Sequence, residues 1–106
     1  MKPILVTSTT PSKEEAETLS AYLVGERLAA CVNIFGPISS FFWWEGKVQK
    51  EEEYKLFIKS TSDLWEKLLG AIREKHSYSV PEVTRIDIDE MNPDYRKWLA
   101  DYLQNI

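Results

Sequence analysis

The chain has 106 residues, 43% of them hydrophobic and 28% charged, which suits one compact domain spanning residues 1–106. Its 17 acidic and 13 basic residues give a net charge of -4, which offers no attraction to nucleic acid or to an anionic membrane surface. No apolar run is long enough to cross a bilayer and no signal-peptide pattern opens the chain, so we expect a cytoplasmic protein.

The first predicted elements are a strand and a helix. Residues 3–8 are rich in β-branched side chains, which favours a mostly buried strand. Ser12 and Glu15 have the spacing of a capping box, so a helix should begin there. Its apolar stripe consists of Ala16, Leu19 and Leu23.

A long hairpin is predicted next. Residues 30–35 alternate with period two, and Gly36-Pro37 should bend or bulge the strand because proline cannot donate to a ladder. Residues 38–44 continue it, Glu45-Gly46 suits a tight turn, and residues 52–59 alternate again as the returning strand.

The second half of the chain predicts a helix, a strand and a closing helix. Ser62-Asp63 begins an apolar helical stripe, residues 76–82 form a connector, and residues 83–89 alternate as a strand. Asn92-Pro93 supplies an N-cap and a first-turn proline for an amphipathic C-terminal helix. The order β-α-β-β-α-β with one added helix predicts an α+β, ferredoxin-like fold.

Four consecutive aromatic residues lie on the predicted hairpin. Because neighbours on a strand point to opposite faces, both faces of this segment are apolar, whereas helices can cover only one face of the sheet. An exposed apolar strand invites aggregation unless closed, symmetric assembly covers it. We therefore expect a homo-oligomer with an interface formed by Phe41, Phe42, Trp43 and Trp44.

Several short segments resemble one known family, the CutA divalent-cation tolerance proteins. Residues 26–34 (ERLAACVNI) and 44–47 (WEGK) resemble its two central motifs, and residues 76–82 (HSYSVPE) resemble its connector. The Thr-x-Pro turn at residues 9–11 and the Tyr-x-x-Trp-Leu pattern at residues 95–99 extend the resemblance over nearly the whole chain.

The resemblance implies a homotrimer that is architecturally similar to PII-type signalling proteins, with hairpins pairing between subunits. It also implies a response to divalent metal ions and copper(II) binding. Copper-binding members have a cysteine at the end of the first strand and a His-His pair before the connector, whereas this chain has Ser8 and Lys75-His76. Ser77 also replaces the usual proline of the connector.

His76 is the candidate metal ligand, since it is the only histidine and imidazole suits copper or zinc. A histidine at a helix end also commonly interacts with the terminal carbonyls instead. Cys31, the only cysteine, excludes an internal disulfide, and it is either a core residue or a soft ligand near His76.

The resemblance also implies an inter-subunit cleft lined by Glu53, Lys59, Tyr78 and Glu82. These residues would hold a small anion or metabolite, or form salt bridges within the trimer. No common catalytic motif occurs and a Cys31–His76 pair is too generic, so no enzyme is predicted. The open alternatives are a metal-binding protein, a PII-like small-molecule sensor and a purely structural trimer.

Overall fold

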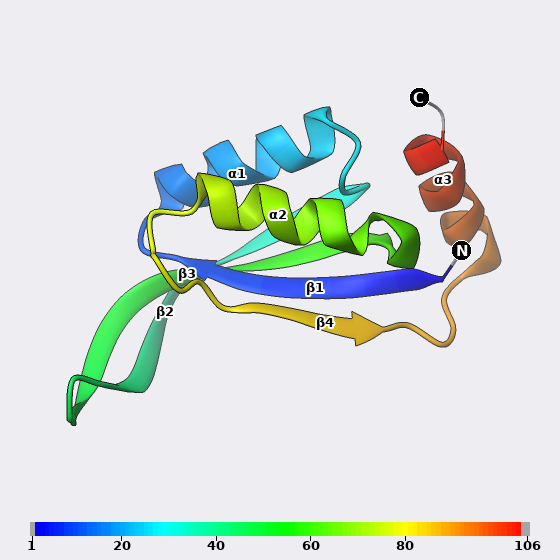
Figure 1. Ribbon diagram of the computed structural model, residues 1–106. Coiled ribbons are helices and arrows are strands. Elements are labelled where there is room, and N and C mark those ends of the chain that lie inside the picture. The colour runs from blue at the N-terminus through cyan, green and yellow to red at the C-terminus, as the bar shows by residue number, and fades with distance from the viewer. Residues whose placement is uncertain (1, 105–106) are drawn as a thin grey trace.

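The computed structural model describes residues 2–104, which form a four-stranded sheet with α1 and α2 on one face and α3 at one end (Figure 1). None of the helices in this range is long and apolar enough to cross a membrane. The elements in chain order are β1 (Pro3–Thr10), α1 (Lys13–Gly25), β2 (Cys31–Trp44), β3 (Lys47–Thr61), the 3-10 turn η1 (Ser62–Leu64), α2 (Trp65–Lys75), β4 (Val83–Asp87) and α3 (Pro93–Gln104).

The sheet has the strand order β2-β3-β1-β4, and every neighbouring pair is antiparallel. This arrangement confirms the predicted α+β, ferredoxin-like fold. Several predicted boundaries were wrong: the first strand continues to Thr10 instead of residue 8, and the returning strand covers Lys47–Thr61 instead of residues 52–59. The last strand ends at Asp87 instead of residue 89, and a 3-10 turn precedes α2 where the sequence pattern suggested continuous α-helix. Tight turns of this kind are frequent at helix ends.

The N-terminus of α1 has one of the two hydrogen bonds expected of a capping box. The Ser12 hydroxyl accepts a hydrogen bond from the Glu15 backbone N–H at 3.1 Å, so the predicted cap is present. The Glu15 carboxylate, however, accepts from the backbone N–H of Ser77 at 3.0 Å. A residue expected to cap its own helix thus ties α1 to the connector, the segment of residues 76–82 between α2 and β4.

The main core lies between the sheet and the two helices. Alternate residues of β1 and β3 point toward α1 and α2, and the strictly aliphatic members are completely buried. Shape-matched aliphatic packing of this kind excludes water and supplies most of the stability of a small domain. The cluster is formed by Ile4, Val6, Ala16, Leu19, Leu23, Ala29, Leu56, Ile58, Leu68 and Ile72.

Beyond the helices, the β2–β3 hairpin continues as a projecting arm, residues 38–53 (Figure 1). At its base Gly36 and Pro37 lie opposite Tyr54, which is the predicted bulge. A side chain at Gly36 would overlap the Tyr54 ring. At its tip Glu45 and Gly46 have φ values of 50° and 77°, as two-residue hairpin turns require.

The sheet face opposite α1 and α2, here called the open face, is not covered by any element that the structure describes across its middle. Phe35 and Ile86 on this face are 64% and 49% exposed. The four arm aromatics are also exposed, at 66% for Phe41, 38% for Phe42, 70% for Trp43 and 52% for Trp44.

Candidate functional site

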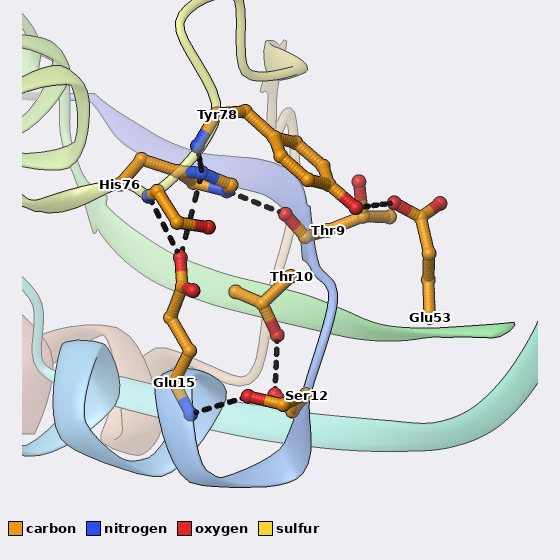
Figure 2. A network of polar contacts seen from close by, with 8 residues as sticks. Thr9, Thr10, Ser12, Glu15, Glu53, His76 and Tyr78 are labelled. Carbon is orange, nitrogen blue, oxygen red and sulfur yellow. Dashed lines mark hydrogen bonds and ion pairs between the residues drawn. The ribbon is translucent and has the colours of Figure 1, made fainter. Parts of the chain in front are cut away.

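The connector lies across the end of β1, and His76 is its buried anchor (Figure 2). The His76 side chain is fully buried, with Nε2 2.6 Å from the backbone carbonyl oxygen of Thr9. The backbone N–H of Tyr78 donates to Nδ1 at 3.0 Å. Because an N–H donor requires a lone pair on Nδ1, the neutral ring carries its proton on Nε2 and donates it to Thr9.

The Glu15 carboxylate lies 3.5 Å from the same Nδ1 atom. This distance is an ion pair only if the ring gains a second proton, and that proton would displace the Tyr78 N–H bond. The neutral network is the better-connected arrangement, because both ring nitrogens and Glu15 then have backbone partners. To bind a metal ion, His76 would have to release one of these hydrogen bonds.

Within residues 2–104, no group of three or more histidine, cysteine or acidic side chains converges as a metal site. The predicted copper ligand therefore has no set of companions among the described residues of the chain. Ser8, which stands where the resemblance places a cysteine, is completely buried, and its hydroxyl has no hydrogen-bond partner in the described residues. The role of His76 as a metal ligand stays a prediction.

Tyr78 joins the connector to the base of the arm. Its hydroxyl donates a 2.8 Å hydrogen bond to the Glu53 carboxylate, and Glu53 is only 6% exposed. Burial raises the pKa of Tyr78 well above its usual value, and the hydrogen bond and negative charge of Glu53 raise it further, with Glu51 and Glu15 adding smaller effects. Tyr78 is therefore a stable neutral donor, and two of the predicted cleft residues are in direct contact.

Glu82 is the centre of a second polar group, on the open face. Its carboxylate accepts hydrogen bonds from the hydroxyls of Thr7 and Thr84, both at 2.8 Å, and from the Lys55 ammonium at 3.0 Å. Burial by itself would raise the pKa of Glu82, but the bonds from Thr84, Lys55 and Thr7 and the Lys55 charge outweigh it and lower this pKa. The Glu82 carboxylate is therefore ionised, and its oxygens have hydrogen-bond donors.

Cys31 and Lys59 lie at the other end of the open face, paired across β2 and β3. The Lys59 ammonium donates to the Asn33 side-chain oxygen at 3.3 Å and lies 5.6 Å from the centre of the Tyr95 ring. Cys31 is partly buried, with Sγ 3.8 Å from the same Asn33 oxygen. Cys31 is thus neither a fully buried core residue nor an isolated thiol.

The structure separates Cys31 from His76 within the chain. Lys59, the partner of Cys31, pairs with Leu5 in β1, whereas His76 contacts Thr9, four residues further along that strand. Four residues of extended chain span roughly 13 Å. A Cys31–His76 nucleophile and base pair, or a shared metal, is therefore not formed within the chain.

Several site residues were missed by sequence reasoning. Lys55 and Thr7 reach Glu82 from neighbouring strands, and Asn33 and Tyr95 surround Lys59. The alternation of β3 does place Lys55 on the same face as Lys59, which was an available signal. The contacts that these residues make across the sheet depend on strand register, and no local sequence pattern indicates them.

Comparison with known proteins decides the family. The model of the family described as CutA1 divalent ion tolerance protein matches residues 4–102. This chain belongs to the CutA1 family. The divalent-cation tolerance protein CutA of Pyrococcus horikoshii is 44% identical over 98 residues, which are 92% of this chain and 95% of that relative.

Solved structures of CutA proteins agree with the sheet and helices described above. The crystal structure of CutA1 from Oryza sativa matches with a TM-score of 0.94 at 40% identity, covering 96% of this chain and 94% of that one. The periplasmic divalent cation tolerance protein CutA from Archaeoglobus fulgidus matches with a TM-score of 0.93 at 36% identity, covering 95% and 98%. The family that the sequence motifs predicted is confirmed.

Proposed function

We propose that this CutA protein is a non-enzymatic binding protein that takes part in the response to divalent metal ions as a homotrimer in the cytoplasm. The observation that carries the metal response is the family match over residues 4–102. The relative from Archaeoglobus fulgidus is named periplasmic, so the compartment needs its own test. Cell fractionation with an antibody against this chain provides one, and recovery from the periplasm would overturn that part.

The open face and the arm support assembly. Leu5, Phe35, Phe57 and Ile86 form an apolar surface on the open face, and the arm carries four more exposed aromatic residues. A protomer with this much exposed apolar surface is more stable when identical copies cover it in a closed ring. The resemblance to PII-type proteins favours three copies.

Copper(II) is the metal we propose to test first, with His76 as the principal ligand. Imidazole is the best nitrogen donor that the chain offers for this ion, whereas Ser8 has only a weakly coordinating hydroxyl. Since His76 must give up a hydrogen bond to Thr9 or Tyr78 to coordinate a metal, the affinity should be low. A neighbouring subunit would have to supply further donors.

Titration calorimetry on the wild type and on His76→Ala in the same buffer tests this proposal. We expect copper affinity to fall at least tenfold in His76→Ala, while sedimentation shows an unchanged trimer. Tyr78→Phe is the matched control, because it perturbs the connector and retains the imidazole. Equal copper affinity in the wild type and His76→Ala would remove His76 from the site.

A PII-like small-molecule sensor is the second candidate, and one observation favours it. An open groove of about 540 Å³ on the open face is lined by Leu5, Asn33, Ile34, Phe35, Phe57 and Lys59. Its single cation beside apolar side chains suits a small anionic metabolite. A thermal-shift screen with metal ions and with nucleotides distinguishes the two candidates, since a ligand that prefers the native state raises the melting temperature.

A further inference from the structure

Helix α3 packs through an apolar cluster of its own, apart from the main core. Leu99 and Leu103 are buried against Ala30, and three partly buried side chains complete the cluster: Leu64, Tyr95 and Tyr102. The main core between the sheet, α1 and α2 includes none of these residues. In Figure 1, α3 lies at the end of the sheet opposite the arm, after a loop that follows β4. Small clusters with few buried residues are the parts of a fold that open at the lowest free energy.

Arg27 holds the C-terminal end of this helix. Its guanidinium donates a 2.7 Å hydrogen bond to the backbone carbonyl of Tyr102 and lies 4.4 Å from the centre of the Tyr102 ring. The Tyr102 hydroxyl donates in return to the carbonyl of Val24 at 2.6 Å. The C-terminal ends of α1 and α3 are thus joined by two bonds of opposite direction, one from Arg27 to Tyr102 and one from Tyr102 to Val24, and these contacts are here called the Arg27–Tyr102 clamp.

The backbone of Arg27 lies in a conformation that glycine adopts more readily. Its φ is 56°, and it follows α1 at the position where glycine commonly ends a helix, with the Leu28 N–H bonded to Leu23 at 2.9 Å. A left-handed conformation is unfavourable for a residue with a Cβ atom. The arginine side chain offsets that cost, because from this position it reaches both the carbonyl and the ring of Tyr102.

The first turn of α3 contacts Lys59, one of the residues that line the open-face groove. The Tyr95 ring lies beside Cys31 and 5.6 Å from the Lys59 ammonium, and Lys59 lines the groove. Burial raises the pKa of Tyr95, and Cys31 raises it further. Movement of α3 would therefore release Lys59 from the ring.

We propose that α3 is a hinged strap, fastened by the Arg27–Tyr102 clamp, that opens as a unit without unfolding the sheet and so frees the Lys59 side chain at this end of the open face. The strap has two docked ends: Tyr102 at the clamp and Tyr95 over Lys59. This device operates on the protein itself and does not depend on whether a metal ion is bound.

Native-state hydrogen exchange on the full chain tests the strap. In the wild type, amides of α3 should exchange faster than those of β1 and β3 and should respond together to low concentrations of denaturant. Arg27→Gly removes the clamp and relieves the backbone. It should accelerate exchange of the α3 amides about tenfold, the effect of losing a charged hydrogen bond and a cation–π contact. The amides of β1 and β3 should keep their wild-type rates.

Two further variants make the outcome decisive. Lys97→Ala removes an exposed pair with Asp101 on the same helix and should leave α3 exchange nearly unchanged. Tyr102→Phe removes the bond to Val24, retains the ring, and should give a smaller acceleration than Arg27→Gly. The proposal is overturned if α3 and β1 exchange at one common rate, if Arg27→Gly leaves α3 unchanged, or if this variant loses the whole fold.

Discussion

The two faces of β3 differ in what covers their side chains. On the face toward α1 and α2, Leu56 and Ile58 are fully buried by residues of the same chain. On the open face, Phe57 and Lys59 alternate with them and line a groove. One face of the sheet is therefore buried when the chain folds, whereas the other presents a surface suited to a further molecule.

The largest effect should follow a substitution on the helix-covered face. Leu56→Ala removes a fully buried side chain and leaves a cavity, which costs about 2–5 kcal/mol of unfolding free energy. Phe57→Ala, the neighbouring residue on the open face, should weaken association more than it weakens the fold of each subunit. Urea unfolding monitored with sedimentation separates the two. Equal losses of unfolding free energy with intact assembly would remove the distinction between the faces.

Next in size should be the loss of an aromatic residue from the arm. Trp44→Asp should dissociate or aggregate the proposed trimer, because aromatic anchors near an interface centre contribute about 2 kcal/mol or more each. Ser39→Asp, which adds a charge to the same arm and removes no aromatic residue, is the matched control. Analytical ultracentrifugation measures both variants. A wild-type monomer, or a trimer of unchanged affinity in Trp44→Asp, contradicts the role of the arm.

A smaller effect is expected where the arm meets the connector. Tyr78→Phe deletes the hydroxyl that bonds the nearly buried Glu53 carboxylate, and leaving such a group without its donor costs about 1–3 kcal/mol. Chemical denaturation of Tyr78→Phe, Glu53→Gln and the double variant gives the coupling energy. Additive losses would mean that the two side chains do not stabilise each other.

The smallest predicted effect depends on pH. The pKa of Glu82 is lowered in the folded state, so its contribution to stability is present above the pKa of an unfolded carboxyl group and is lost as the pH falls through the folded value. Since the side chain is 38% exposed, solvent screening keeps this contribution below about 1 kcal/mol. The difference between wild type and Glu82→Gln in urea midpoint should therefore shrink on acidification. A difference in urea midpoint that does not change with pH would assign the effect of Glu82→Gln on stability to packing.

The sequence predicted most of the fold because its signals are local. Period-two alternation placed Leu56 and Phe57 on opposite faces, and Ser12 and Asn92 marked the beginnings of helices that the structure confirms. The helix that begins near Ser62 was less well defined, because the 3-10 turn there has no sequence signature distinct from α-helix.

The candidate site was predicted only in part because its contacts join residues far apart in the chain. Glu53 and Tyr78 are separated by 25 positions and Thr7 and Glu82 by 75, and such pairs are fixed by strand register and not by spacing. The surroundings of His76 could not be foreseen, since the ring binds a backbone carbonyl and a backbone N–H. Backbone groups are present at every position and leave no trace in the residue pattern.

The bulge at Gly36-Pro37 has a consequence for how this chain tolerates change in length. It adds one residue to β2 opposite Tyr54, so even-numbered residues beyond it occupy the side that odd-numbered residues occupied before it. Inserting a single residue between the bulge and the tip would reverse the sides of the arm aromatics. Matched pairs of insertions on β2 and β3 would preserve them. Natural variation in arm length should therefore proceed in steps of two residues per strand, with position 36 retaining glycine.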